Sequence, residues 1–504
     1  MFSSLPYEAY RMLSRKHLAM LTFFCGMSIF CIIFGILVII LWWVLHDAIL
    51  RSQLVLKPGN TAYDVWIKNP VPLTLKFHMF NWTNPEDIYN TSTKLKFQEL
   101  GPYVYRETKE KVNVTWNANE TVTFRTVKTW WFDQESSNGS VHDAFTTINP
   151  VALSAAFVAR NWHYMIKKGL SVSLRSLIDS IAITQSVGKV LFTGYEDPLM
   201  TTASKIPFLS LKSLPFKDKF GWFYGRNGSE NYEGVFEMDT GFSGHLGELR
   251  SWNYAKYSSF YQGECGGLKD SSSGEFFPRE LTKESIIKLF SPDLCRFMEL
   301  EYEKEIVING VVGYKYSAGQ RFLDNGTLIP ENKCFCEGDC MPSGTVNVST
   351  CKFGSPAFVS LPYFYKADPY YINSIEGMTP SEEKSDFFLV LEPRTGIPLQ
   401  VAARLQLNMR LQSIEEIRMY NDVPTVFIPV LYFEQTLTIP ENMIYMLKIL
   451  LNLKYICMAI GILCICTGVL VSVCVIYKII TIKSGPMRRV EMRVKVKEEQ
   501  PLNQ

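Results

Sequence analysis

The sequence predicts a mixed α+β protein in which one large, β-rich unit lies between two membrane-spanning helices. Three observations support this class. An uncharged apolar stretch lies near each end of the 504-residue chain, at residues 18–45 and 455–477. Between them, runs of alternating apolar and polar residues are typical of half-buried strands. One region, near residues 149–190, instead has the three-to-four-residue apolar spacing of helices.

Each apolar stretch is long enough to cross a bilayer, because a helix needs roughly 20 apolar residues to span the hydrocarbon core. The alternatives are a buried core helix and, for the first stretch, a cleaved signal peptide. The apolar part of a signal peptide is only roughly 7–15 residues long. We therefore expect a tail at residues 1–17, a transmembrane helix at 18–45, an ectodomain at 46–452, a second transmembrane helix at 453–477 and a tail at 478–504.

Basic residues flank both spans on the side of the chain termini. Arg11, Arg15 and Lys16 precede the first span, and the second is followed by Lys478, Lys483, Arg488, Arg489, Arg493, Lys495 and Lys497. Basic flanks stay in the cytoplasm, so we expect both termini there and the intervening residues outside the cytosol. The net charge of +2 argues against a nucleic-acid partner.

Glycosylation sequons support this topology. Asn-x-Ser/Thr occurs between the spans and in neither tail, at Asn81, Asn90, Asn113, Asn119, Asn138, Asn227, Asn325 and Asn347. Such sequons are acceptors for glycans on a segment that has passed through the secretory pathway.

Cysteines point to the same compartment. Six of the 12 cysteines lie between the spans, at Cys265, Cys295, Cys334, Cys336, Cys340 and Cys351. An even number in an oxidising compartment predicts three disulfides, although six cysteines allow 15 pairings. A zinc site at Cys334-Phe335-Cys336 is the alternative, but zinc sites usually show two Cys-x2–4-Cys or Cys/His pairs, and no His lies nearby.

Strand signals dominate the region between the spans. Apolar residues alternate with polar ones from Val71 to Met79 and again from Leu399 to Met409. Residues 306–312 predict a hairpin, because Asn309-Gly310 supplies the positive φ angles of a type I′ turn between two apolar runs.

Helix signals are concentrated near residues 149–190. Asn149-Pro150 is a helix start, with Asn as the cap and Pro at the first position. A one-sided apolar stripe follows and predicts a helix that ends at Gly169, with the stripe formed by Val151, Ala155, Val158, Trp162 and Met165. A second helix is expected from about residue 171 to 183.

Motifs for catalysis and for cofactor binding are absent from the sequence. It has no Gly-x-Ser-x-Gly, His-Glu-x-x-His, P-loop or Gly-x-Gly-x-x-Gly pattern, and its histidines are scattered. We therefore expect a protein that is not an enzyme and that holds no cofactor and no metal.

A series of short segments resembles the class B scavenger receptor family, which includes the fatty-acid translocase, the high-density-lipoprotein receptor and a lysosomal membrane protein. The matching order and spacing extend over about residues 45–440. The segments are Gly101-Pro-Tyr-Val-Tyr-Arg106, Gly194-Tyr-Glu-Asp-Pro198, Ser291-Pro-Asp-Leu-Cys295, Cys334-Phe-Cys336, Cys351-Lys352, Val359-Ser-Leu-Pro362, Leu391-Glu-Pro-Arg-Thr-Gly396, Leu405-Gln-Leu-Asn408 and Ile428-Pro-Val-Leu431.

The resemblance implies an antiparallel β-barrel-like core with a small helical apex bundle at residues 149–190. It also implies disulfides that join Cys265 to Cys334, Cys295 to Cys351 and Cys336 to Cys340. The spacing of the last pair is shorter than in the best-known relatives.

The resemblance further implies a receptor in the plasma membrane, with a lysosomal or endosomal membrane as the other location. Ligand would dock at the apex, and lipid would pass through an ectodomain tunnel to the bilayer. The implied partners are fatty acids, sterols or carotenoids, lipoproteins and anionic cell surfaces. The resemblance is also compatible with a homo-oligomer. The candidate ligand-binding residues are the basic side chains of the apex, Arg160, Lys167, Lys168 and Arg175. For Lys167 and Lys168 the alternative is a purely local role, in the last turn of the predicted helix.

Two other functions share part of this evidence. Two-span ligand- or acid-gated ion channels also have glycosylated, disulfide-rich ectodomains, but the second span here offers few polar residues for an ion path. A lysosomal sorting or lipid-export receptor of the same family would need an acidic residue followed by two bulky aliphatic residues in its tail. Residues 498–503 come near this signal, but Leu502 is followed by Asn503.

Overall fold

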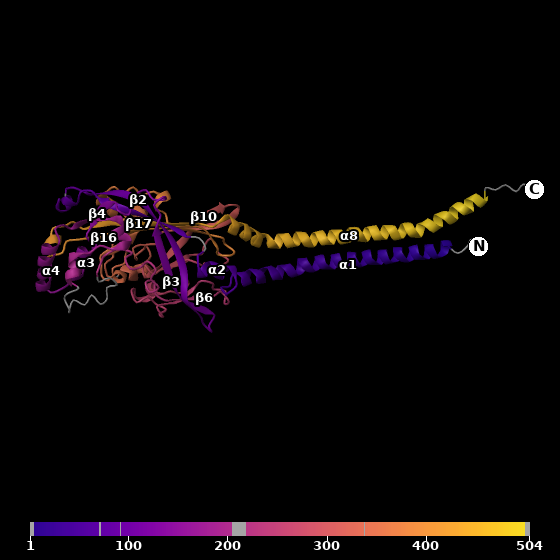
Figure 1. The fold of residues 1–504 in the computed structure, drawn as a ribbon, viewed down its shortest axis with the longest axis horizontal. Helices are drawn as coiled ribbons and strands as arrows, with labels where there is room; N and C mark the ends of the chain where they lie inside the picture. The colour runs from indigo at the N-terminus through magenta and orange to yellow at the C-terminus, as the bar shows by residue number, and fades with distance from the viewer. Residues whose placement is uncertain (1–4, 70–71, 91, 204–217, 337, 499–504) are drawn as a thin grey trace, which may run out of the picture. The chain divides into compact units, whose positions relative to one another are not determined.

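The computed structural model describes residues 5–69, 72–90, 92–203, 218–336 and 338–498 (Figure 1). The chain forms two compact units. One contains the terminal segments up to Ser52 and from Asn442, and the other, here called the central unit, is Gln53–Glu441. The tail residues 499–503 of the near-match to a sorting signal lie outside the described residues.

The terminal unit consists of two long helices, α1 (Leu5–Gln53) and α8, which begins at Glu441 and ends at Glu498. Each contains a segment that is long and apolar enough to cross a membrane, Ala19–Trp42 in α1 and Glu441–Thr481 in α8. Most side chains in these segments face outward from the unit. The helices therefore fit the predicted two-span organisation.

Small residues let α1 and α8 approach closely. The Ser28 hydroxyl donates a hydrogen bond to the carbonyl oxygen of Gly468 at 2.8 Å. A Cβ atom on Gly35 would lie 2.6 Å from the carbonyl oxygen of Gly461, and one on Gly468 would lie 2.9 Å from that of Ser28. Close backbone approach through small residues is how helices associate in lipid.

The central unit is built on a 15-stranded sheet. The strand order is β7-β6-β3-β2-β1-β17-β16-β15-β11-β10-β9-β8, with β12, β13 and β14 paired off this path. An isolated bridge between Glu248, next to β7, and Ser272 in β8 links the two ends of the path. The sheet is therefore nearly closed, and its neighbours are antiparallel except for the β14–β2 and β8–β9 pairs. This agrees with the α+β fold and barrel-like core that were expected.

The strands have the following bounds: β1 Leu73–Trp82, β2 Leu95–Trp116, β3 Thr121–Phe132, β4 Ala144–Ile148, β5 Ala182–Ser186, β6 Phe236–Asp239, β7 Leu249–Trp252, β8 Ser271–Ser272, β9 Ile287–Ser291, β10 Arg296–Ile308, β11 Val311–Ser317, β12 Thr345–Asn347, β13 Ala357–Ser360, β14 Ile375–Glu376, β15 Phe388–Leu391, β16 Pro398–Leu411 and β17 Val426–Thr438. β4 and β5 form a separate two-stranded sheet. The remaining α-helices are α2 Thr61–Ile67, α3 Pro150–Ala159, α4 Tyr164–Leu177, α5 Pro198–Ala203, α6 Pro369–Asn373 and α7 Glu382–Ser385. The short helices η1 Pro85–Tyr89, η2 Lys189–Thr193, η4 Gly263–Gly266, η5 Pro330–Cys336, η6 Thr350–Lys352, η7 Pro362–Phe364 and η8 Arg418–Tyr420 complete the described elements.

The strands that alternation predicted are present. The predicted run at 71–79 corresponds to β1 from Leu73 onward, whereas Val71 lies outside the described residues, and Leu399–Met409 lies within β16. The predicted hairpin is formed by β10 and β11, where Ile308 pairs with Val311. Its turn residues Asn309 and Gly310 have φ angles of 47° and 80°, as a type I′ turn requires.

Three disulfides cross-link the central unit. They are Cys265–Cys334, Cys295–Cys351 and Cys336–Cys340. These are the three pairs that the resemblance implied. The first two close loops of 69 and 56 residues, whereas the third closes one of only 4.

Candidate functional site

The helical apex, defined here as α3, α4 and residues 160–163 between them, lies at one end of the central unit, and α2 lies at the other (Figure 1). α3 begins as predicted. The Asn149 side chain accepts hydrogen bonds from the backbone N–H groups of Val151 (3.1 Å) and Ala152 (3.0 Å), and Pro150 occupies the first helical position.

The predicted bounds of the two helices were wrong. α3 ends at Ala159, and a new helix, α4, begins at Tyr164, with the extended residue His163 as its cap. Gly169 therefore lies inside α4 rather than at a helix end, and the helix expected at 171–183 is the second half of α4 followed by β5. As a result, Lys167 and Lys168 lie near the N-terminal end of a helix, where the dipole does not favour cations.

The predicted apolar stripe lies largely at the surface. Val158, Trp162 and Met165 are exposed, whereas the buried residues of α3 are Pro150, Ala152, Leu153, Ala156, Phe157 and Ala159. The periodicity identified an apolar face of the helical region, but it does not say what covers that face.

The four basic candidates have different surroundings. The Arg160 guanidinium lies 3.6 Å from the centroid of the Phe157 ring and donates to the Phe157 carbonyl oxygen at 2.7 Å. Burial lowers the pKa of Arg160. Lys167 is half-buried and forms an ion pair with Glu416.

Lys168 and Arg175 are exposed. The Lys168 ammonium lies 5.5 Å from the centroid of the Tyr164 ring. Two of the four candidates are thus available at the surface, and two are held by neighbours.

The sequon asparagines also differ in surroundings. Asn90, Asn113, Asn119, Asn138 and Asn227 are exposed, and Asn81 and Asn347 are half-buried. Asn325 is buried, and its side-chain amide donates to the Met341 carbonyl oxygen at 2.5 Å. A glycan on Asn325 would require this hydrogen bond and the packing around it to be lost.

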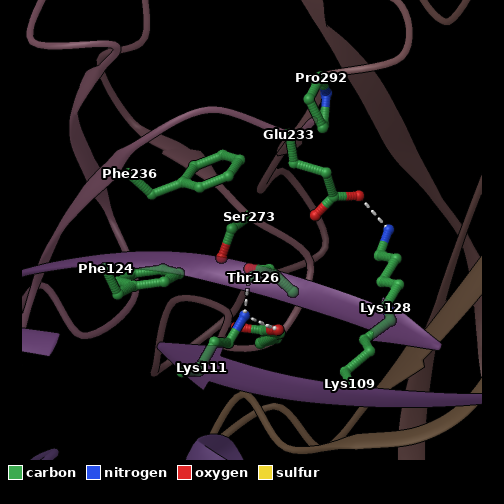
Figure 2. A pocket seen from close by; sticks show the side chains of 10 residues that line it. Lys109, Lys111, Phe124, Thr126, Lys128, Glu233, Phe236, Ser273 and Pro292 are labelled. Atoms are coloured by element: carbon green, nitrogen blue, oxygen red, sulfur yellow. Dashed lines mark hydrogen bonds and ion pairs between the residues drawn. The ribbon is translucent and has the colours of Figure 1, made fainter. Parts of the chain in front are cut away.

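A polar cavity that the sequence did not indicate lies between β2, β3, β6 and the loops around Ser273 and Pro292 (Figure 2). Its volume is about 60 Å³. Its lining consists of Lys109, Lys111, Phe124, Thr126, Lys128, Glu233, Phe236, Ser273, Glu275 and Pro292.

Each buried ammonium in this cavity has a carboxylate partner. Lys111 donates to Glu275 at 2.5 Å and to Thr126 at 3.1 Å, and Lys128 forms an ion pair with Glu233 (Figure 2). Burial lowers the pKa of Lys111, whereas for Lys128 the charges of Glu233 and Glu107 outweigh burial and raise the pKa. The third lysine, Lys109, pairs with Glu107 at 3.5 Å, outside the lining. The cavity is therefore polar with paired charges, and it suits small polar molecules rather than an apolar lipid chain.

The central unit is a nearly closed sheet with a helical apex. At each end of this unit the chain continues into a helix that is long and apolar enough to span a membrane. These features fit the class of two-span membrane proteins. Comparison with known proteins identifies the family. The family model for the CD36 family matches residues 26–479, and the chain belongs to this family.

Three relatives illustrate its range. Protein peste of Drosophila melanogaster is 36% identical over 82% of this chain and 75% of its own length. Scavenger receptor class B member 1 of Bos taurus is 32% identical, over 85% of each chain. Lysosome membrane protein 2 of Homo sapiens is 29% identical over 82% of this chain and 87% of its own length. The chain is thus similar to proteins named as scavenger receptors and to a protein named for the lysosomal membrane.

Proposed function

We propose that this chain is a scavenger-type cell-surface receptor that binds lipid, lipoprotein or other polyanionic ligands at its helical apex. The observation that carries this proposal is the similarity to scavenger receptor class B member 1 along 85% of the chain. Two helices that could span a membrane and a disulfide-bonded central unit between them are consistent with such a receptor.

Lys168 and Arg175 are the proposed charged contacts. Both side chains are exposed on α4, and cationic side chains attract anionic ligands and steer their approach. Lys167 and Arg160 have a different proposed role. The ion pair of Lys167 with Glu416 and the stacking of Arg160 on Phe157 hold the apex in shape, so substitutions there would act through structure.

We further propose that lipid passes through the ectodomain to the membrane by a tunnel. The supporting argument is physical. A fatty acid or sterol crosses water slowly because its apolar surface is hydrated unfavourably, and an apolar passage removes that barrier. The polar cavity of Figure 2 does not fit this role, so the passage would be lined by other residues.

The apex is tested by uptake of fluorescent fatty acid, sterol ester and anionic lipoprotein into cells that express the chain. Lys168→Glu/Arg175→Glu is compared with Lys256→Glu/Lys269→Glu, a charge reversal at exposed positions outside the apex, at matched surface levels. Loss of anionic-lipoprotein uptake in the first variant alone supports the apex contacts. Equal uptake in both would remove Lys168 and Arg175 from the proposal, and no uptake of any ligand by the wild type would overturn the receptor function.

The tunnel is tested with lipoprotein that carries one label on its sterol ester and another on its protein. Passage through a tunnel delivers lipid in excess of protein. Delivery of both labels in equal proportion would show uptake of whole particles and would contradict the tunnel.

A lysosomal or endosomal location is a second candidate, because lysosome membrane protein 2 covers 82% of this chain. Imaging of the tagged full chain against plasma-membrane and lysosomal markers distinguishes the two locations. The matched family and the names of these relatives give the ion-channel alternative no support.

A further inference from the structure

The tip of the β10–β11 hairpin, defined here as Ile306–Val312, has an unusual composition for a turn at a protein surface. The tip contains no charged residue, and apart from Asn309 and Gly310 it consists of isoleucine and valine. Val307 and Val312 pair with each other across the two strands, and they are 64% and 48% exposed. Turns that face water are normally polar, so this exposed pair indicates contact with another apolar phase.

The hairpin tip is packed firmly through its other face. Val311 is only 4% exposed. At the next position on the same face, a Cβ atom on Gly313 would lie 2.6 Å from a side-chain carbon of Val390 and 2.9 Å from one of Leu399. One face of the hairpin therefore lies on the sheet, and the opposite face holds Val307 and Val312 outward in fixed positions.

The hairpin tip projects from the edge of the sheet at which the chain leaves for α8. On this edge β17 ends at Thr438, which pairs with Gln400 of β16. The last pair between β15 and β11 joins Leu391 to Tyr314, and the hairpin continues beyond it for three residues, about 10 Å of strand. β10 accordingly lies at the end of the central unit opposite to the apex (Figure 1).

Paired charges lie at the base of the hairpin tip. Lys304 lies 3.0 Å from Glu303, and Lys283 lies 2.9 Å from Glu305. An apolar end with lysines beside it is typical of segments that enter the surface of a bilayer, because lysine side chains can place their charge among the head groups.

We infer that the hairpin tip rests on the membrane that α1 and α8 would cross, in the leaflet that faces the central unit. The candidate span in α8 begins at Glu441, close after the end of β17 at Thr438, so the chain itself tethers this edge of the sheet to that membrane. Two valines would hold a free particle or a soluble partner only weakly, because association costs translational and rotational freedom. For a tethered surface most of this cost is absent, and a small contact is sufficient.

The contact would set the orientation of the central unit above the bilayer. It is independent of the ligand at the apex, because it depends only on the hairpin and on the spans.

The test measures how close the hairpin tip lies to lipid. The full chain, in a background without the six free cysteines, carries Asn309→Cys labelled with a fluorophore, in nanodiscs whose phosphatidylcholine bears a nitroxide near the head group. A nitroxide quenches the fluorophore only at short range. Ser176→Cys, an exposed position of α4 at the opposite end of the central unit, carries the control label.

The label at Asn309 should be quenched, and the label at Ser176 should not. Val307→Thr/Val312→Thr keeps the branched shape and the strand propensity but replaces one methyl group of each side chain by a hydroxyl group. It should lower the ratio of bound to free hairpin tips by roughly 10- to 100-fold, because the gain from removing two apolar side chains from water is largely lost.

Val158→Thr/Val172→Thr is the matched control, because it makes the same change at two exposed valines of the apex. Quenching of the label at Asn309 should stay at the wild-type level in this variant. A thermal unfolding curve verifies the fold of each variant.

Two results would overturn the inference. One is equal quenching of the Asn309 label in Val307→Thr/Val312→Thr and in the wild type. The other is an unquenched Asn309 label in the wild type, and cross-linking between the Asn309→Cys tips of two chains would then assign the tip to a second copy. The proposed function fails separately, because cells that take up no lipid or lipoprotein would leave the quenching result unchanged.

Discussion

A half-buried carboxylate, Glu99 in β2, links this strand to β1, β17 and η7 and is expected to set part of the acid stability of the central unit. His78 Nδ1 in β1 lies 2.7 Å from one carboxylate oxygen, and Tyr432 in β17 donates to the same oxygen at 2.9 Å. Tyr363 in η7 donates to the other oxygen. The imidazole ring of His78 also stacks on Tyr432, with 4.2 Å between ring centroids.

These contacts determine the sign and size of the effect. Burial alone would raise the pKa of Glu99, but the hydrogen bonds from His78, Tyr363 and Tyr432 and the charge of His78 outweigh it and lower the pKa from 4.5 to about 2. The unfolded chain therefore binds this proton at higher pH than the folded chain does. The stabilisation is complete above pH 4.5 and is lost as the pH falls towards 2. After allowance for partial solvent exposure, we expect about 2 kcal/mol.

Glu99→Gln tests this reasoning. At neutral pH the variant should unfold about 2–3 °C below the wild type for a unit of this length, and the two melting temperatures should converge as the pH approaches 2. The assay is thermal unfolding of the full chain in nanodiscs, followed by tryptophan fluorescence across this pH range. Glu110→Gln is the control in the same strand, because the pair of Glu110 with Lys68 is exposed, and exposed pairs contribute little. A constant difference between Glu99→Gln and the wild type at every pH would refute the assignment to the carboxylate charge.

Four further outcomes are expected. Lys111→Met should lower the free energy of unfolding by about 3 kcal/mol, because Glu275 loses its buried partner, and the double variant Lys111→Met/Glu275→Met should recover most of this loss. Chemical denaturation measures both values, and a double variant as unstable as Lys111→Met would contradict the pairing. Replacement of the Cys265–Cys334 pair by alanine should destabilise the chain by about 4 kcal/mol, and replacement of the Cys336–Cys340 pair by about 2 kcal/mol, because the first disulfide closes a loop of 69 residues and the second a loop of 4. Equal losses of stability in melting experiments would argue against the chain-entropy explanation. The glycan mass, measured as the gel shift on deglycosylation, should be the same for Asn325→Gln as for the wild type and smaller for Asn113→Gln, because Asn325 is buried and Asn113 is exposed. A smaller shift for Asn325→Gln would refute this prediction. In a background without the six free cysteines, Gly468→Leu should reduce oxidative cross-linking between Ser28→Cys and Ser472→Cys. Gly26→Leu is the control and should not reduce it, because a Cβ atom on Gly26 meets nothing within 4 Å. The readout is whether the terminal fragments stay joined after the central unit is cleaved, and equal cross-linking in both variants would contradict the close packing of α1 and α8.

Local signals in the sequence predicted those features whose cause is also local. Asn149-Pro150 starts α3 because cap and first helical residue are adjacent in the chain, and Asn309-Gly310 forms the β10–β11 turn because two neighbouring residues supply the required φ angles. The two apolar stretches are likewise recognised by length alone.

Features that depend on distant partners could not be predicted in this way. Lys111 is buried because Glu275, far along the chain, supplies a carboxylate and Phe124 an aromatic face 4.7 Å away. Lys167 is held by Glu416 for the same reason. Nothing near either lysine in the sequence identifies its partner. The polar cavity and the different surroundings of the four basic apex residues are therefore visible only in the fold.

The exposed apolar stripe is informative for function. Amphipathic periodicity reports that one face of a helix avoids water, and in most proteins the fold itself covers that face. At the apex the buried side of α3 is instead formed by residues such as Ala152, Leu153 and Phe157, while Val158, Trp162 and Met165 remain outside. Because exposed apolar side chains carry a free-energy cost in water, their presence on this surface is most simply explained by a ligand that is itself apolar. The sequence signal that predicted a helix here therefore also marks the surface on which the proposed receptor would meet its ligand.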